Sequence, residues 1–323
     1  MLSRLTAAFD PYILALLGTV AFASFLPAQG GVAHAVEWAA NAGIVLLFFL
    51  HGAKLSREAA LAGAGNWRLH LSVMGATFVM FPLLGLAMTF IPGVDPIVAS
   101  GILFLTLLPS TVQSSVAFTS IAKGNVAAAI CSASFSNLIG LFITPLLTAL
   151  LMHGRGAGVS VGAVEKIVAQ LLLPFVAGQL LRPVIGGFLG RHKQLVTYVD
   201  RGSILLVVYS AFSAAVVGGL WHKLPLFSLG EIIVLNILLL AVVLALTWRA
   251  GALSGFPRED RIVLLFCGSK KSLASGVPMA GVLFPAAQVG AAILPLMLFH
   301  QIQLMACAVI ARQLGGAGAK DES

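Results

Sequence analysis

Two adjacent lysines, Lys270 and Lys271, stand in the middle of a long apolar stretch of the chain. A lysine at the centre of a bilayer costs about 3 kcal/mol even on a lenient insertion scale, so the pair indicates a function. Neighbouring residues of a helix point about 100° apart, so a regular helix could turn only one of them toward a narrow cavity. We expect at least one ammonium group to line a cavity and attract an anion. The alternative is that the stretch is wrongly bounded and the pair lies at the membrane surface.

Polar residues interrupt two apolar stretches in a similar way. Residues 108–115 read LPSTVQSS and residues 267–278 read CGSKKSLASGVP, with apolar residues on both sides of each. A polar centre containing Pro or Gly is typical of a discontinuous membrane helix, which frees backbone groups around a polar cavity. We therefore predict a binding site where the two interruptions meet, with half-helix N-termini that favour negative groups.

Hydroxyl and amide side chains in or near the interruptions add hydrogen-bonding capacity. Ser132 and Ser136 are four residues apart and can share one helix face. Such side chains often hydrogen-bond only their own or a neighbouring helix. A lone histidine such as His300 is more often a packing residue than a ligand. The candidate binding residues are Lys270, Lys271, Ser269, Ser272, Ser114, Ser115, Gln113, Thr111, Ser132, Ser136, Asn137, His300 and Gln301.

The sequence does not indicate an enzyme. It contains neither a His-Glu-x-x-His zinc motif nor a complete P-loop. Ser272 beside Lys271 would make a Ser–Lys nucleophile pair only if the two side chains faced each other, and adjacent helical residues do not. Cys131, Cys267 and Cys307 lie in apolar runs and resemble small core residues. We expect no catalytic residue, no metal ligand and no cofactor.

The composition excludes a water-soluble protein. Hydrophobic residues make up 59% of the chain and charged residues 9%, whereas soluble domains carry about 25% charged residues. Apolar runs of about 20 residues suit transmembrane helices, and barrel strands would be shorter and alternating. The net charge is +8, but the lysines and arginines form no run longer than two residues. We therefore expect the lipid bilayer, and not nucleic acid, as the partner.

Ten membrane spans are predicted, with both termini on one side. Of the 19 lysines and arginines, 14 fall in one set of loops and termini, while Arg155, Lys166 and Lys223 fall in the other. Cytoplasmic loops carry the positive excess, so we expect both termini and the loop from Arg182 to Arg201 in the cytoplasm. The membrane would be the plasma membrane, which is the inner membrane of a Gram-negative cell. The spans are 10–27, 32–51, 67–91, 96–122, 125–151, 164–182, 202–220, 229–250, 260–284 and 289–311.

Ten spans divide into two halves of five, which insert in opposite orientations because five is odd. This inverted-repeat architecture is found in many secondary transporters. We expect a first repeat at residues 1–153, a second, inverted repeat at 164–313 and a disordered cytoplasmic tail at 314–323. The predicted fold class is an all-α polytopic membrane protein with broken helices at spans four and nine, which are equivalent in the two repeats.

Motifs along nearly the whole chain resemble those of the bile acid:sodium symporter superfamily (solute carrier family 10), in its divergent SBF-like branch. They are FLHGAKL at 49–55, NWRLH at 66–70, LPSTVQSS at 108–115, AKGN at 122–125 and LFCGSKKSLASG at 265–276. The resemblance implies that the broken spans four and nine cross. It also implies a core domain of spans three to five and eight to ten, interleaved with a panel domain of spans one, two, six and seven.

The resemblance does not carry sodium coupling to this chain. In sodium-coupled members, sodium sits beside the crossing, bound by side chains that this sequence largely lacks. When the motifs are matched, the glutamine ligands of those members fall on Thr77 and near Lys270, and their glutamate falls near Phe266. Two of their ligands on span five fall on Ala129 and Ala133. Their Ser-Asn pair falls on Ser114 and Ser115. Thr77 thereby joins the candidate residues. His300-Gln301 matches a His-Asn pair of the family without a known role.

The sequence therefore predicts a secondary active transporter of a small organic anion, with a membrane regulator or scaffold of the same fold as the alternative. An ammonium group would occupy roughly the place of the sodium ion. We expect Lys270 in that role, or Lys271 if the register is shifted by one residue. Burial favours a neutral amine and a bound anion favours ammonium, so anion binding could take up a proton. Transport would then be coupled to a proton or uncoupled, and sodium is the other possible coupling ion.

Overall fold

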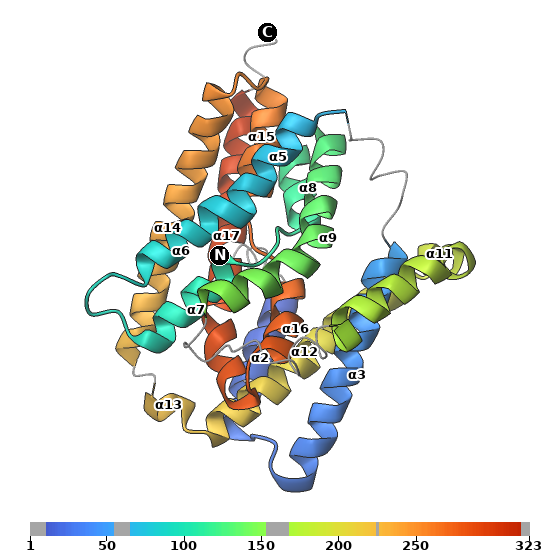
Figure 1. Ribbon diagram of the computed structural model, residues 1–323, viewed down its shortest axis with the longest axis vertical. Helices are drawn as coiled ribbons and strands as arrows, with labels where there is room; N and C mark the ends of the chain where they lie inside the picture. Colours follow the sequence, from blue (N-terminus) through green and yellow to red (C-terminus); the bar gives the residue numbers. More distant parts are fainter. Residues whose placement is uncertain (1–10, 55–64, 153–167, 224–225, 318–323) are drawn as a thin grey trace, which may run out of the picture. The chain divides into compact units, whose positions relative to one another are not determined.

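The computed structural model describes residues 11–54, 65–152, 168–223 and 226–317 (Figure 1), and its regular elements are all helical. The chain forms two compact units, each assembled from separate parts of the sequence. Two helices, α16 (Leu273–Leu283) and α17 (Ala286–Ala317), contribute residues to both units.

The first unit contains the helices α2 (Pro11–Phe25), α3 (Gly30–Lys54), η2 (Val168–Leu172), α11 (Leu173–Arg191), α12 (Lys193–Val217) and α13 (Leu220–Lys223). Two glycines set the close crossing of α3 and α11. A Cβ atom on Gly52 would lie 2.0 Å from the Phe175 carbonyl oxygen, and one on Gly178 would lie 2.0 Å from the Phe49 carbonyl oxygen. Small residues let membrane helices approach this closely, and here no residue larger than glycine fits.

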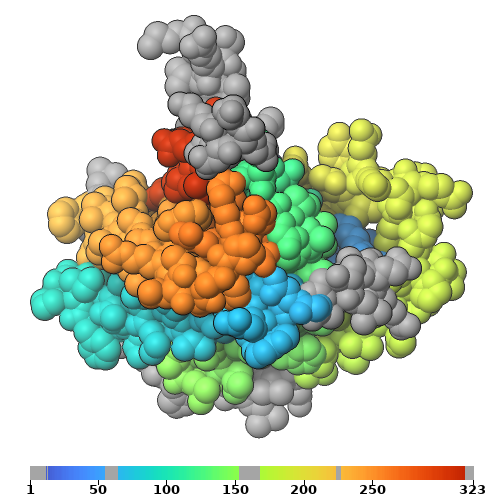
Figure 2. Space-filling view, turned by 90° about the horizontal axis from the view of Figure 1, so that it is seen from above, coloured from blue at the N-terminus to red at the C-terminus, as the bar shows by residue number. Residues whose placement is uncertain are grey.

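The second unit contains α5 (Trp67–Gly75), the π-helical turn η1 (Ala76–Met80), α6 (Phe81–Met88), α7 (Pro96–Thr106), α8 (Gln113–Ile121), α9 (Val126–Leu151), α14 (Leu226–Leu253) and α15 (Arg258–Gly268). Asp95 caps α7 and Asn125 caps α9 by accepting a hydrogen bond from a backbone N–H of the first turn. Helix α15, in orange, packs against α5, in light blue (Figure 2).

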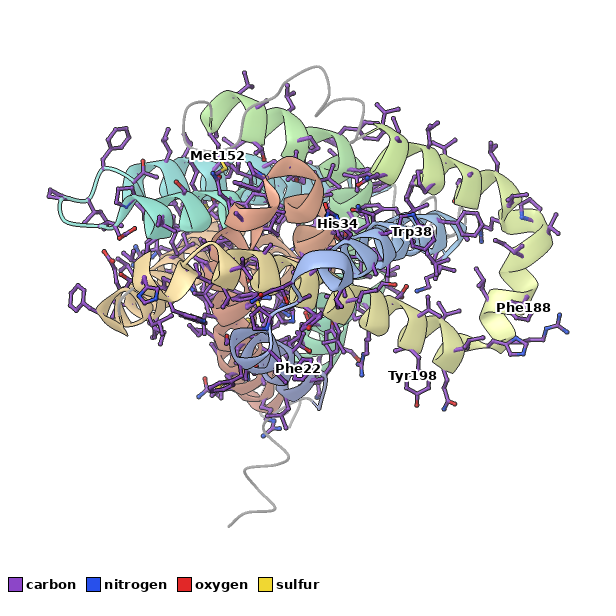
Figure 3. The ribbon with its side chains drawn as sticks, turned by 90° about the horizontal axis from the view of Figure 1, so that it is seen from below. Phe22, His34, Trp38, Met152, Phe188 and Tyr198 are labelled. Atoms are coloured by element: carbon purple, nitrogen blue, oxygen red, sulfur yellow. The ribbon has the colours of Figure 1, made fainter. Side chains whose placement is uncertain are left out.

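The outer surfaces of the helices are apolar. Phe22, Trp38 and Tyr198 point outward from the first unit (Figure 3), and Trp38 is 75% exposed. A surface with so many large apolar side chains faces lipid, because contact of these side chains with water would be unfavourable. Seven described helices are long and apolar enough to cross a membrane: Gly30–Lys54, Trp67–Met88, Val126–Leu151, Val168–Arg191, Lys193–Val217, Phe227–Leu253 and Ala286–Gly316. The protein is therefore a polytopic membrane protein.

The other three predicted spans are not single long helices. Span one is represented by the shorter helix α2. Span four is split into α7 and α8, with residues 107–112 non-helical, and span nine into α15 and α16, with residues 269–272 non-helical. The breaks are shorter than the polar motifs, since residues 113–115 and 273–276 already form first helical turns. Ser272 starts α16, because its side chain and carbonyl accept from the N–H groups of Ser275 and Gly276.

Two predicted boundaries are wrong. The loop expected from Arg182 to Arg201 is almost entirely helical, because the apolar stems of arginine and lysine let helices run past the apolar layer. The tail expected from residue 314 is helical through Ala317. There Arg258 donates to the Leu314 carbonyl, and Gly315 lies against the carbonyl of Ile121. Residues 1–10 and 153–163, which belong to the predicted first repeat and the loop after it, and residues 318–323 lie outside the described residues.

Candidate functional site

The two helix breaks are in direct contact. The Ser272 N–H donates to the Pro109 carbonyl at 2.8 Å, which joins the break of span nine to that of span four. The Ser110 hydroxyl donates to the Cys267 carbonyl at 2.6 Å, and the Ser115 hydroxyl donates to the Phe266 carbonyl at 3.1 Å. The crossing predicted for spans four and nine is thus a hydrogen-bonded junction within the second unit.

Every carbonyl from residue 106 to residue 110 finds a partner outside its own helix. A helix end leaves its last carbonyls without intrahelical donors, and Pro109 adds to this because it has no N–H to offer Thr106. The Ser110 N–H, the next possible donor, bonds instead to the Ser136 hydroxyl at 2.9 Å. In chain order the carbonyls accept from Lys271 Nζ, Thr144 Oγ1, Lys271 Nζ, the Ser272 N–H and Asn137 Nδ2.

Lys271 lies in a cage of three backbone carbonyls. Its ammonium nitrogen is 2.8 Å from the oxygens of Thr77 and Thr106 and 2.7 Å from that of Leu108. The nitrogen also lies 4.1 Å from the centroid of the Phe81 ring. An ammonium group has three N–H donors, so the three oxygens satisfy it completely. Lys271 is 0% exposed, and the cage supplies the acceptors that a buried ammonium group needs.

The free carbonyl of Thr77 follows from the π-helical turn. In a regular helix the N–H of Phe81 would donate to Thr77, but here it donates to Ala76, five residues back. In the π register the next donor for Thr77 would be residue 82, which is a proline without an N–H. The turn and Pro82 together leave the Thr77 oxygen available to Lys271.

Gln303 of α17 fixes the backbone of Lys271. Its side-chain oxygen accepts from the Lys271 N–H at 2.9 Å, and its side-chain nitrogen donates to the Lys271 carbonyl at 3.0 Å. The same nitrogen lies 2.9 Å from Nδ1 of His300. Lys271 is therefore held both at its backbone and at its ammonium group.

Lys270 is buried in different surroundings. Its ammonium nitrogen donates to the Ser114 carbonyl at 2.9 Å and lies 3.9 Å from the centroid of the Phe118 ring and 5.2 Å from that of Phe266. Aromatic faces attract a cation but supply no lone pair. Among the described residues, Lys270 thus has one carbonyl acceptor where Lys271 has three.

Both lysines point into the protein. Each is 0% exposed, so neither side chain lies on the outer surface of the protein. The expectation that only one could turn inward assumed a regular helix, and residues 269–272 are not helical. Neither lysine reaches solvent in this structure, and anion binding at the pair stays a prediction.

Several other predicted residues gather at the crossing. The Thr111 hydroxyl lies 2.6 Å from that of Ser114 and 3.2 Å from that of Ser115. Ser275 joins Ser272 to the side chain of Asn137 through hydrogen bonds of 3.1 and 2.9 Å. Ser136 and Ser269 are also buried there. The bonds of Thr111 and that between Ser272 and Ser275 are local, whereas Ser136 and Ser275 also bond to other segments. The Ser269 hydroxyl has no hydrogen-bond partner among the described residues.

The remaining predicted residues have separate environments. Gln113 is exposed at the start of α8. Ser132 pairs with Nδ1 of His70 at 2.7 Å. The Thr77 hydroxyl and the Gln301 side-chain oxygen are buried without a hydrogen-bond partner in the described part of the chain.

Sequence reasoning missed the groups that hold the lysines. The carbonyls of Thr106 and Leu108 carry no residue-type signal, although Pro109 marks the end of that half-helix. In the sequence, Phe81 and Phe118 resemble ordinary apolar residues of a transmembrane helix. Gln303 gives a usable signal, because an amide three residues after His300 lies on the same helix face.

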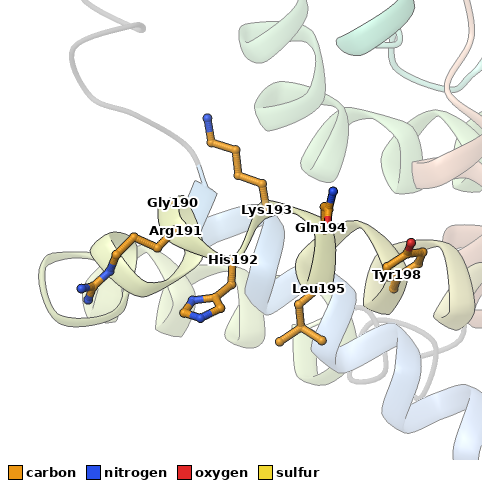
Figure 4. Close-up of a pocket in the computed structure, with 7 residues that line it drawn as sticks. All are labelled: Gly190, Arg191, His192, Lys193, Gln194, Leu195 and Tyr198. Atoms are coloured by element: carbon orange, nitrogen blue, oxygen red, sulfur yellow. The ribbon is translucent and has the colours of Figure 1, made fainter.

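A surface pocket of about 660 Å³ lies at the turn between α11 and α12 of the first unit (Figure 4). Arg191, His192 and Lys193 contribute to its lining, but Lys193 points away from the other two side chains. The basic groups do not converge on one point, and none of the predicted site residues lines this pocket.

Long apolar helices and two crossing broken helices around two buried lysines are typical of a membrane protein of the transporter class. The chain belongs to the SBF-like CPA transporter family, which it matches over residues 10–315. This confirms the resemblance recognised in the sequence and places the chain in a transporter family.

Curated relatives extend over nearly the whole chain. An uncharacterized protein of Pseudomonas aeruginosa is 57% identical over 94% of this chain and 92% of its own length. The "Putative symporter YfeH" of Escherichia coli K12 is 53% identical over 96% of this chain and 94% of its own length. The sodium/bile acid cotransporter 7 of Danio rerio is 25% identical over 93% of this chain and 91% of its own length. The relatives thus include a protein named as a putative symporter and one named as a sodium/bile acid cotransporter.

Proposed function

We propose that the protein is a secondary active transporter of a small organic anion, and that Lys270 binds the negative group. The observation that carries the proposal is the burial of Lys270 with one carbonyl acceptor for its three N–H donors. A buried charge needs a partner. In the described residues the only salt bridge joins Lys54 to Asp200, so no carboxylate there neutralises Lys270. An anionic substrate would supply the missing acceptor.

The proposed architecture is two inverted five-span repeats, residues 1–153 and 164–313, with both termini cytoplasmic in the plasma membrane. The equivalent positions of the two breaks, in spans four and nine, support the repeats. The grouping of α2, α3, α11 and α12 in one unit supports a panel domain distinct from a core domain. The positive charge of the predicted cytoplasmic loops supports the orientation.

We propose that a proton, and not sodium, accompanies the anion. The resemblance puts two sodium ligands at Ala129 and Ala133 and a third near Phe266, and all three are fully buried apolar residues. They offer no side-chain oxygen to a metal ion, and two nearby ammonium groups would repel one. Without an anion, burial favours the neutral amine of Lys270, and an anion that binds there favours the ammonium form, so that binding takes a proton into the site.

Uptake into liposomes that contain the purified protein tests this function. The probes are radiolabelled taurocholate and small mono- and dicarboxylates, each offered in sodium and in choline medium. We expect uptake of at least one probe in choline, faster with an inward proton gradient and lost in Lys270→Gln. A folded protein that moves none of the probes would favour the regulator or scaffold. Uptake that depends steeply on a sodium gradient would instead support the sodium-coupled symporter mechanism.

A further inference from the structure

The carbonyl cage around Lys271 has the construction of a monovalent-cation site. Its three oxygens all come from backbone carbonyls, one from the π-helical turn η1 and two from the end of α7. Rings of backbone carbonyls replace the hydration shell of monovalent cations in selectivity filters. The C-terminal end of a helix, such as that of α7, also carries the negative pole of the helix dipole, which favours a cation.

The oxygens of the cage are kept free by sequence features that do not involve the lysine. Pro109 and the diverted Ser110 N–H free Thr106, and the π-helical turn with Pro82 frees Thr77. The cage is therefore built into the backbone, and the lysine fills it. Gln303 holds the Lys271 backbone by two hydrogen bonds, so the ammonium group is delivered to a fixed place.

We propose that the Lys271 ammonium is a resident cation that joins η1 to the end of α7, and that the cage binds a free monovalent cation once this amine is removed. Lys271 is then a positioning residue and Lys270 is the anion-binding residue. The assignment rests on the proposed function only for the role of Lys270. The site takes a primary ammonium ion by its geometry, since three acceptors at 2.7–2.8 Å match three N–H donors.

Chemical rescue of the purified variant Lys271→Ala tests the resident cation without any substrate. The loss of the amine leaves three buried carbonyls without a donor, and we expect Tm to fall by roughly 5–10 °C. Methylammonium chloride should restore most of this loss. Tetramethylammonium chloride at the same ionic strength should not, because it has the charge but no N–H donor. Sodium and potassium chloride are compared in parallel, and specific stabilisation of this variant by either also supports a cation site.

Lys270→Ala is the matched control, since it removes the neighbouring buried ammonium but leaves the cage occupied. It and the wild type should gain nothing from methylammonium beyond the effect of tetramethylammonium. Equal stabilisation of all three proteins, or no specific stabilisation of Lys271→Ala by any of these ions, would overturn the inference. If Lys271→Ala cannot be purified in folded form, Lys271→Met provides the test. Methionine fills the volume of the lysine side chain without an N–H donor. A Tm below that of the wild type supports the cage, and a Tm equal to that of the wild type refutes the cage. Failure of anion uptake in liposomes would leave each of these outcomes unchanged.

Discussion

The ammonium nitrogen of Lys271 lies 2.8 Å from the carbonyl oxygen of Thr77, although 194 residues separate the two in the sequence. The bond links the π-helical turn in the first half of the chain to the break in span nine. The bond gives a hydrogen-bond partner both to a buried ammonium group and to a buried carbonyl. The junction of the two broken helices therefore uses backbone carbonyls as acceptors and lysine and hydroxyl side chains as donors.

The Ser110 hydroxyl should contribute measurably to this junction. Ser110→Ala removes the donor to the Cys267 carbonyl and leaves a buried acceptor unpaired, which costs about 1–3 kcal/mol. We expect a lower Tm for the purified protein in detergent. Ser120→Ala is the control, because Ser120 is exposed on α8. Equal Tm values for the two variants would show that the bond across the breaks is not stabilising.

The close contact between α3 and α11 should not tolerate a side chain at Gly52 or Gly178. Gly52→Ala or Gly178→Ala places a Cβ atom 2.0 Å from a backbone carbonyl oxygen, so the helices must separate. Overpacking of this kind costs about 1–3 kcal/mol. Gly18→Ala is the control, since no atom lies within 4 Å of its added Cβ. Thermal unfolding should show a lower Tm for the first two variants and an unchanged or higher Tm for the control. The opposite ranking would contradict the crossing.

Much of the fold is predictable from the sequence, because membrane helices are long and apolar. Seven predicted spans correspond to long helices, and the polar motifs locate both breaks. Helix ends are less predictable, since charged residues such as Arg191 and Lys193 extend helices beyond the apolar layer. The surroundings of the lysines are least predictable. They depend on carbonyls freed by a π-helical turn, and residue types do not encode the direction of a carbonyl.

Cysteine labelling tests the predicted orientation in the membrane. Gln288 and Gln194 are both exposed, and the ten-span topology puts the first outside the cell and the second in the cytoplasm. In intact cells, Gln288→Cys should react with an impermeant thiol reagent and Gln194→Cys should react only after lysis. The native cysteines are buried and give a low background. Labelling of Gln194→Cys from outside, with protection of Gln288→Cys, would refute the topology.

The most direct test of the central claim is thermal unfolding of the purified protein with a panel of organic acids, in sodium and in choline buffer. A ligand at a hundredfold excess over its Kd stabilises by about 2.7 kcal/mol, which is visible as a rise in Tm. We predict that at least one organic anion raises Tm equally in both buffers. We also predict that Lys270→Gln abolishes this rise while its Tm without ligand stays close to that of the wild type. Stabilisation that requires sodium and survives Lys270→Gln would contradict an anion site built on a buried lysine.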